Sequence, residues 1–283
     1  MRADPTVLQN IISEETGLEY EAEAKILKGG EFEYFLKPAG LPLETSFQIR
    51  VAPGWRRLRL SFEPGRFARE LLVAMSRADQ TGRTAFVSIL EHCADKGAEI
   101  TAKVNDVPSS FEAPDIWEKE WNRFSLQLSR GQLGLGLDEG EPDEQIVIRW
   151  AGMFASAITA ILPVEEETKE MPGYPEGSVT TVQVNRYERD RRNRAAAISI
   201  HGKACKACGL DMARKYGTVA SGFIEVHHIV PVSEIGGNYQ IDPSKDLVPL
   251  CPNCHAVVHR RNPPFSVEEV SRMIKKSTDE VPM

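Results

Sequence analysis

The stretch DLVPLCPNCHAVVH, residues 246–259, is the densest run of metal-binding side chains in the sequence. It contains the pair Cys251-x-x-Cys254, followed by His255 and His259. A Cys-x-x-Cys loop can supply two thiolates to a tetrahedral ion. Residues four apart lie on one face of a helix, so the two histidines can bind an ion together. This stretch predicts a fold that depends on metal.

A second Cys-x-x-Cys pair lies upstream, and the rare residues gather around both pairs. Four of the five cysteines and five of the six histidines fall between His201 and His259. In a reducing compartment such clustering favours a metal site over disulfides. Two chelating pairs make a closed tetrahedral site, which predicts a structural Zn²⁺. The predicted ligands are Cys205, Cys208, Cys251 and Cys254.

Two other chemistries use similar cysteine patterns. A thioredoxin-like redox pair needs a single Cys-x-x-Cys in a βαβ setting. The run from Cys251 to His255 also fits the haem-attachment pattern Cys-x-x-Cys-His, which requires export from the cytoplasm. The N-terminus MRADPTVLQN shows no export signal, and no apolar run is long enough to cross a membrane. Zinc is therefore the preferred interpretation, in a protein expected to be cytoplasmic.

Between the two cysteine pairs lies IEVHHIVP, residues 224–231, followed by the turn signal Gly236-Gly237-Asn238. The segment is typical of a short β-strand. Adjacent residues of a strand point to opposite faces, so His227 and His228 should have different tasks.

These motifs together resemble the HNH, or ββα-metal, nucleases, over about a third of the chain. The resemblance implies that His228 is the general base, activating a water for attack on phosphorus. It implies that His227, His255 and His259 hold a catalytic divalent ion, Mg²⁺, Mn²⁺, Co²⁺, Ni²⁺ or Zn²⁺. A histidine titrates near neutral pH, and a divalent ion stabilises charge on the phosphate and the departing 3′ oxygen.

One position departs from the family pattern. The middle residue of the HNH signature is usually asparagine, and Asp246 aligns with it here. A carboxylate can accept a hydrogen bond or approach a metal, but it cannot donate as an amide does. We take His228 and Asp246 as the catalytic candidates. The alternative is an inactive, zinc-dependent DNA-binding module on the same scaffold.

Positive charge collects beside the predicted site although the chain carries a net charge of −7. Residues 178–283 contain 15 Lys and Arg against 11 Asp and Glu, so the acidity belongs to the first part. Arginines in this part of the chain predict contacts with DNA phosphates. For the helix around 186–194 the alternative is that its arginines face solvent and form ion pairs within the helix. A basic, aromatic hairpin at 55–59 could bind an extruded base, or could be a strand with a packed tryptophan. The predicted nucleic-acid contacts are Arg189, Arg192, Arg260, Arg261, Trp55 and Arg57.

The chain is predicted to be an α+β protein of two parts. Residues 1–163 form an α+β domain of unassigned fold, and 164–180, rich in acid, proline and glycine, form a linker. Residues 181–283 form the zinc-stapled nuclease domain. In the first part, alternation predicts strands at 31–36, 47–51 and 58–62, and helical periodicity marks 67–76, 85–94 and 145–162. A capping box at Ser266 and Glu269 predicts the last helix.

This two-part plan resembles the McrA-type restriction endonucleases, which act on DNA with modified bases. The resemblance implies an endonuclease that cuts double-stranded DNA, directed at methylated or hydroxymethylated cytosine. The alternative within the same chemistry is a nuclease of a mobile element or defence system that ignores modification. A second copy of the chain is a further possible partner. One HNH site cuts one strand, so a double-strand break needs two active sites, which a homodimer would supply.

Overall fold

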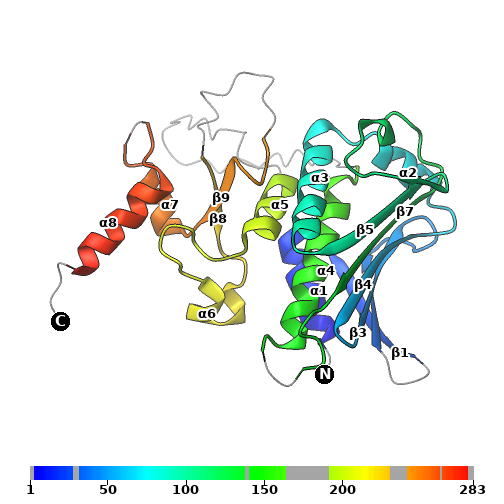
Figure 1. Ribbon diagram of the computed structural model, residues 1–283, viewed down its shortest axis with the longest axis horizontal. Helices are drawn as coiled ribbons and strands as arrows, with labels where there is room; N and C mark the ends of the chain where they lie inside the picture. Colours follow the sequence, from blue (N-terminus) through cyan, green and yellow to red (C-terminus); the bar gives the residue numbers. More distant parts are fainter. Residues whose placement is uncertain are drawn as a thin grey trace, which may run out of the picture.

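The computed structural model describes residues 3–27, 32–137, 140–163, 191–229, 241–261 and 263–279. An N-terminal layer of sheet and helices is joined to a smaller C-terminal unit (Figure 1). The strands are β1 (Tyr20–Ile26), β2 (Phe32–Pro38), β3 (Phe47–Gly54), β4 (Arg57–Pro64), β5 (Ala98–Val104), β6 (Val107–Ser109), β7 (Phe124–Gly131), β8 (Glu225–His228) and β9 (Leu247–Leu250). The α-helices are α1 (Pro5–Thr16), α2 (Arg69–Ser76), α3 (Gln80–Asp95), α4 (Asp143–Ala160), α5 (Arg191–His201), α6 (Met212–Tyr216), α7 (Pro252–Val258) and α8 (Val267–Asp279). The short 3-10 helices are η1 (Pro114–Ile116) and η3 (Thr218–Ala220).

The N-terminal part is built on an antiparallel seven-stranded sheet with the order β1-β2-β3-β4-β7-β5-β6. Alternation within the strands gives the sheet one apolar face. In β4, for example, Leu58 and Leu60 are buried while Arg57 and Arg59 are exposed. Helices α1, α3 and α4 cover the apolar face, and the opposite face carries no helix in the described part of the chain (Figure 1).

The α+β prediction is confirmed, and so are its individual elements. The strands predicted at 31–36, 47–51 and 58–62 are β2, β3 and β4. The three predicted helices correspond to α2, α3 and α4. The sequence pattern does not predict α1, β1, β5, β6 or β7, or the order of the strands in the sheet.

Helix α5 joins the two parts because it contributes to both hydrophobic cores. Ala196 is buried in the core of the sheet layer, and Ile198 is buried in the core of the C-terminal unit. Figure 1 shows α5 between the sheet layer and β8–β9. The predicted linker at 164–180 lies outside the described residues, so the boundaries at 163 and 181 stay predictions.

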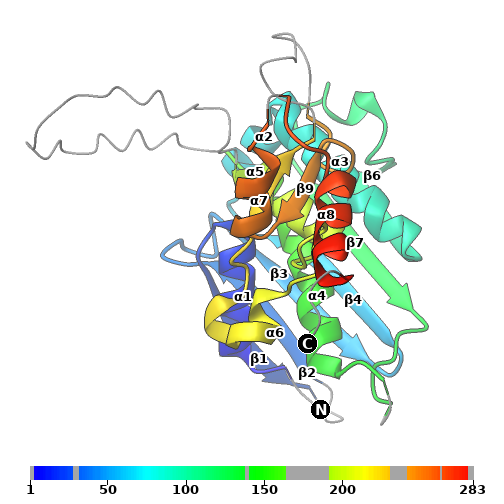
Figure 2. The ribbon, with the colours of Figure 1, turned by 90° about the vertical axis from the view of Figure 1, so that its left-hand side faces the viewer.

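The C-terminal unit consists of the antiparallel hairpin β8–β9 followed by α7 and α8. Figure 2 shows α7 and α8 on the side that faces away from the sheet layer. The predicted capping box is confirmed: Glu269 N donates to Ser266 Oγ over 3.2 Å, and Ser266 N donates to Glu269 Oε2 over 2.7 Å. Among the described residues, no helix is both long enough and apolar enough to cross a membrane.

Candidate metal centre

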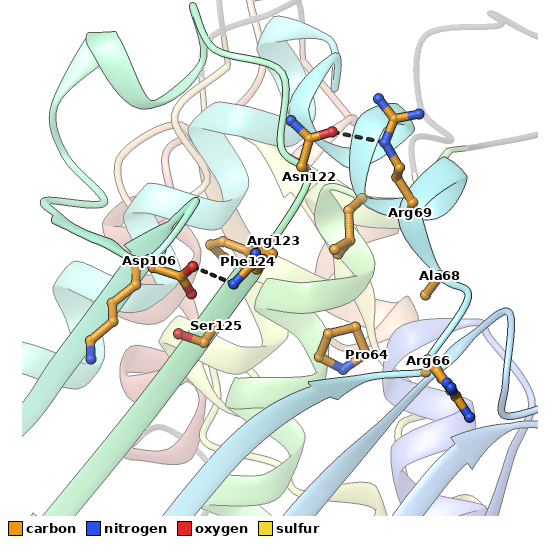
Figure 3. A pocket seen from close by; sticks show the side chains of 12 residues that line it. Pro64, Arg66, Ala68, Arg69, Asp106, Asn122, Arg123, Phe124 and Ser125 are labelled. Atoms are coloured by element: carbon orange, nitrogen blue, oxygen red, sulfur yellow. Dashed lines mark hydrogen bonds and ion pairs between the residues drawn. The ribbon is translucent and has the colours of Figure 1, made fainter.

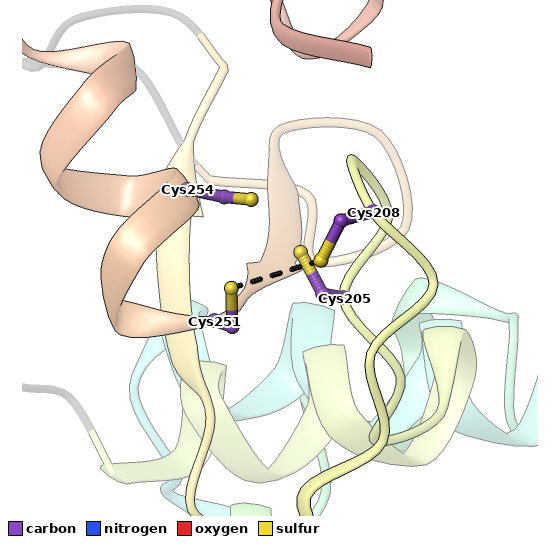
Figure 4. Close-up of side chains that lie close together, drawn as sticks. All are labelled: Cys205, Cys208, Cys251 and Cys254. Carbon is purple, nitrogen blue, oxygen red and sulfur yellow. Dashed lines mark hydrogen bonds between the residues drawn. The ribbon is translucent and has the colours of Figure 1, made fainter. Parts of the chain in front are cut away.

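The four cysteines converge from two segments that are far apart in sequence. Cys205 and Cys208 lie in the loop after α5, while Cys251 caps the N-terminus of α7 and Cys254 lies within that helix. Their sulfur atoms all lie within 4.8 Å of one another (Figure 4). The Sγ atoms of Cys208 and Cys251 are 3.8 Å apart.

This spacing fits a tetrahedral zinc ion. Zinc–sulfur bonds of about 2.3 Å give a regular tetrahedron with sulfur–sulfur edges of about 3.8 Å. The local backbone holds the first pair in place, because Gly209 N donates to Cys205 O over 2.8 Å with Gly209 in the left-handed region at φ +73°. Lys206 N also donates to Pro249 O over 3.0 Å, which ties this loop to β9. The donor set and the geometry both suit a structural zinc.

The backbone around the cage also favours a thiolate. Burial acts to raise the pKa of Cys205, but the backbone N–H groups of Cys251, Cys208 and Ala207 outweigh it and lower that pKa. Ligation by zinc requires the thiolate form of cysteine. The shift is in the opposite direction at Cys208 and Cys254, where burial raises the pKa of each thiol, so the backbone favours the thiolate at Cys205 and not at these two positions.

Three histidines form a second cluster beside the first. His227 comes from β8, while His255 lies in α7 and His259 ends it. Their candidate ligand nitrogens lie within 4.8 Å of one another, and the Nε2 atoms of His255 and His259 are 3.3 Å apart. A tetrahedral ion with metal–nitrogen bonds of about 2.0–2.1 Å spaces two ligands about 3.3–3.4 Å apart. The expectation that His255 and His259 share a helix face is met.

The environment of His227 keeps its imidazole neutral. The side chain is buried, with 5% of the residue exposed. Burial, and secondarily the charges of His255, His259 and His228, lower the pKa of His227 to about 4. A neutral ring keeps a nitrogen lone pair, which is what a divalent ion requires of a histidine ligand.

His228 and Asp246 lie at the end of the hairpin where β8 ends and β9 begins. His228 is half-buried and pairs in register with Leu247, directly after Asp246. Asp246 is buried and its Oδ2 accepts a hydrogen bond from Asp242 N over 2.7 Å. Its backbone oxygen accepts from Ile229 N over 2.8 Å. Asp246 thus closes the loop that leads into β9, while His228 alternates with the buried His227.

Glu225 belongs to the site, although the sequence reading did not include it. Its Oε2 accepts a hydrogen bond from His255 Nδ1. This contact turns Nε2 of His255 toward His259, and a carboxylate in this position fixes the tautomer and orientation of a metal-binding histidine. The signal was available in the sequence: Glu225 and His227 are two residues apart on a strand, and therefore share a face.

Arg260 and Arg261 follow His259 directly, as the sequence indicated, but they differ in their contacts. Arg260 is exposed, with no ion pair in the described part of the chain. Arg261 donates from both terminal nitrogens to Glu269, over 3.2 and 3.0 Å, and its guanidinium lies 4.1 Å from the centre of the Phe265 ring. Arg261 therefore also fastens α8 to the end of α7.

The structure corrects the assignment of Arg192 as a phosphate contact. Its side chain is only 13% exposed, and both terminal nitrogens donate to the Asp79 carboxylate at 2.9 Å. Asp79 caps the N-terminus of α3, so the guanidinium joins α5 to the sheet layer instead of facing solvent. Arg189 lies outside the described residues, and its predicted role stays a prediction.

Trp55 and Arg57 lie on the other part of the molecule from the histidines. Trp55 lies in the β3–β4 turn and Arg57 begins β4, where it pairs with Gly54, so the hairpin predicted from the sequence is present. Trp55 is 75% exposed and Arg57 is exposed. The packed tryptophan that was the alternative interpretation is wrong.

Comparison with known proteins agrees with this geometry. Residues 205–261 match the family model of the HNH endonucleases. The chain is 34% identical over 100 residues to the type IV methyl-directed restriction enzyme EcoKMcrA of Escherichia coli strain K12, a match that covers 34% of this chain and 34% of that enzyme. No solved structure matches the chain significantly. Both clusters lie inside residues 205–261, the range that is similar to the HNH endonuclease model.

Proposed function

We propose that this protein is a metal-dependent DNA endonuclease that hydrolyses phosphodiester bonds. The observation that supports it most is the three-histidine cluster with His228 adjacent on the same strand, inside the range that matches HNH endonucleases. When bound there, a divalent ion would stabilise negative charge on the phosphate and on the departing oxygen. His227, His255 and His259 would hold it.

His228 is the proposed general base. It takes a proton from a water molecule as that water attacks phosphorus in line with the departing 3′ oxygen. The phosphorus–oxygen bond to the 3′ oxygen breaks, which leaves a 3′-hydroxyl and a 5′-phosphate once that oxygen is protonated. Glu225 acts through His255 as a positioning residue, and Arg260 contributes a phosphate contact next to His259.

The proposed substrate is double-stranded DNA with modified cytosine, as in a restriction enzyme. The similarity to a methyl-directed enzyme supports this over 100 residues only. Since an HNH site cuts one strand, we further propose that two copies of the chain act on one duplex. Two measurements test this arrangement: whether nicked plasmid accumulates before linear plasmid, and whether the mass of the DNA-bound protein is that of two chains.

Plasmid cleavage tests the proposal. Methylated, hydroxymethylated and unmodified plasmids are incubated in parallel with the protein and Mg²⁺, Mn²⁺, Co²⁺ or Ni²⁺. The expected result is cutting of modified plasmid that His228→Ala abolishes and His201→Ala retains. His201 is a matched control, because its Nε2 lies 3.1 Å from Pro243 O and outside the three-histidine cluster.

Each other outcome identifies a different function. Equal cutting of all three plasmids would show a nuclease that is indifferent to modification. Binding without cutting under any metal would show a zinc-dependent binding module. Equal cutting by the parent protein and His228→Ala would overturn the assignment of the general base.

A further inference from the structure

Trp55 is the most exposed tryptophan of the protein, and it is held in a fixed position. Its indole lies against Gly136, where an added Cβ would come within 3.2 Å of Trp55 Cδ1. Gly136 N donates to Asp143 Oδ1 over 3.0 Å, which anchors that loop to the start of α4. An apolar ring that is 75% exposed yet supported from below is a ready stacking surface.

The turn that carries Trp55 is strained and fastened. Arg56 has φ +52°, which is uncommon for a residue other than glycine. Arg56 N donates to Leu135 O and Leu133 N donates to Arg56 O, both over 3.1 Å. Such strain persists where surrounding structure imposes it, and it concentrates at ligand-binding sites. The strand pair therefore presents Trp55 in a defined orientation.

Arginines surround this ring on the uncovered face of the sheet. A groove of about 460 Å³ runs from Trp55 past Arg57 and Arg59, with Gln127 and Ser129 on its far side. The strand register explains the arrangement, because Arg59 pairs with Ser129 and alternates with the buried Leu58 and Leu60. A second groove of about 550 Å³ begins at the same turn and adds Arg56 and Gln132. Arg130 also lines it, but Arg130 pairs in register with the buried Leu58 and so lies on the other face of the sheet.

The charge of this surface is opposite to that of the chain. Five arginines line the two grooves against two glutamates, in a protein of net charge −7. Arg50 is engaged by Glu33. Arg57 and Arg59 have no carboxylate within ion-pair distance among the described residues. Uncompensated guanidinium groups beside an exposed indole complement a polyanion that carries aromatic rings.

Another basic groove on this part of the molecule is a weaker candidate. It measures about 510 Å³ and lies between β4, α2 and β7 (Figure 3). Two of its arginines are already paired: Arg123 with Asp106 over 2.6 Å, and Arg69 with Glu120 over 2.9 Å. Its positive charge is therefore partly neutralised within the protein.

We propose that the surface formed by Trp55, Arg56, Arg57, Arg59 and Gln127, here called the Trp55 groove, is a second nucleic-acid site. An unstacked base lies on the indole, with the flanking phosphates on the arginines and Gln127 available to the edge of the base. The inference rests on the proposed DNA-directed function. The uncovered sheet face is turned away from β8, β9 and α7 (Figure 1), so recognition and cleavage occupy separate surfaces.

Binding by the full-length chain tests this site. His228→Ala serves as the background, so that the probes survive, and affinity is measured by fluorescence anisotropy. The probes are a fully paired duplex, the same duplex with one unpaired 2-aminopurine, and a single strand. The background protein should prefer the last two probes and quench 2-aminopurine. Added Trp55→Ala should lose about tenfold in affinity and the quenching, while Trp55→Tyr should keep most of both.

The arginines have their own readout. Arg57→Ala and Arg59→Ala should each weaken binding and reduce the slope of log affinity against log salt by about 0.7 to 0.9. Arg123→Ala is the matched control, because that arginine is exposed on the same sheet and already paired with Asp106. It should leave the slope unchanged.

Several results would overturn the proposal. Unchanged affinity and quenching in Trp55→Ala would exclude stacking. Competition by polyglutamate as strong as that by oligonucleotide would point to an acidic protein as the partner. Plasmid cutting by the parent protein separates this proposal from the nuclease. If the protein cuts plasmid but its binding does not depend on Trp55, only the proposal of a second site is contradicted. If its binding depends on Trp55 but it does not cut, only the proposed nuclease function is contradicted.

Discussion

Glu225 on β8 and His255 on α7 are joined within the C-terminal unit by a hydrogen bond in which the Nδ1–H of His255 donates to the Glu225 carboxylate. This contact fixes which ring nitrogen of His255 faces the other two histidines. Nδ1 carries the proton, so Nε2, which lies 3.3 Å from Nε2 of His259, presents its lone pair to the cluster. The Glu225 carboxylate therefore orients His255, while the three histidines remain the candidate ligands of the ion.

Removal of this carboxylate should weaken metal binding while leaving the fold intact. We expect Glu225→Ala to raise the concentration of divalent metal needed for half-maximal cleavage by about 10- to 100-fold, with Glu225→Gln in between, since an amide oxygen still accepts. Glu268→Gln, an exposed position on α8, is the control and should behave as the parent. A metal titration of plasmid cleavage measures the shift. Unchanged half-saturation in Glu225→Ala would remove Glu225 from the site.

Loss of zinc should unfold the C-terminal unit. Its core is small and includes Cys205, Cys251 and Cys254 themselves, so ligation replaces packing that a larger domain would supply. A structural zinc site contributes about 10–16 kcal/mol of binding free energy to folding. Chelation, or Cys254→Ser, should therefore abolish cleavage and expose residues after α5 to protease, while the sheet layer persists. One zinc per chain at the four cysteines is expected by elemental analysis. An unchanged melting curve after chelation would contradict the prediction.

The sequence predicted those parts of the site that depend on local spacing. Alternation along a strand separated His227 from His228, and helical periodicity paired His255 with His259. The capping box at Ser266 was also readable, because its two hydrogen bonds join residues three apart. Each of these relationships is decided within one element, where backbone geometry alone sets the direction of a side chain.

The contacts that the sequence could not give join distant segments. Arg192 and Asp79 are 113 residues apart, and nothing in the local pattern distinguishes this arginine from a solvated one. The position of β7 between β4 and β5 is likewise set by packing across the whole sheet. Trp55 illustrates the same limit, because the loop at Gly136 that its indole contacts lies outside the hairpin.

The pair formed by Arg192 and Asp79 should stabilise the junction between the two parts. Burial acts to raise the pKa of Asp79, but hydrogen bonds from Arg192 and Gly82 N outweigh it and lower that pKa from its usual range. A depressed carboxyl pKa stabilises the folded state above the unfolded value, and the stabilisation disappears as the pH falls through the folded value. Arg192→Met should therefore cost about 1 kcal/mol of unfolding free energy at pH 7, and less once the pH falls through the lowered pKa of Asp79.

DNA binding gives the complementary measurement for this variant. Because the positive charge of Arg192 is already paired with Asp79, Arg192→Met should leave the affinity for DNA and the salt dependence of that affinity unchanged. Arg260→Met should do the opposite, weakening binding and reducing the salt slope by about 0.9 while leaving the melting temperature unchanged. Weaker DNA binding by a stably folded Arg192→Met would restore the phosphate-contact role.

Asp246 provides the sharpest test of the catalytic arrangement, because its structural task can be separated from any chemical one. Its carboxylate accepts the N–H of Asp242, and an asparagine side chain can accept the same hydrogen bond through its amide oxygen. Asp246→Asn should therefore fold as the parent does and keep its cleavage rate. Asp246→Ala should leave the partly buried N–H of Asp242 without this acceptor, lower stability by about 1 kcal/mol and reduce cleavage at least about tenfold. If Asp246→Asn kept its melting temperature but lost cleavage, the negative charge itself would be required, and Asp246 would act on the ion or on His228 beyond holding the loop.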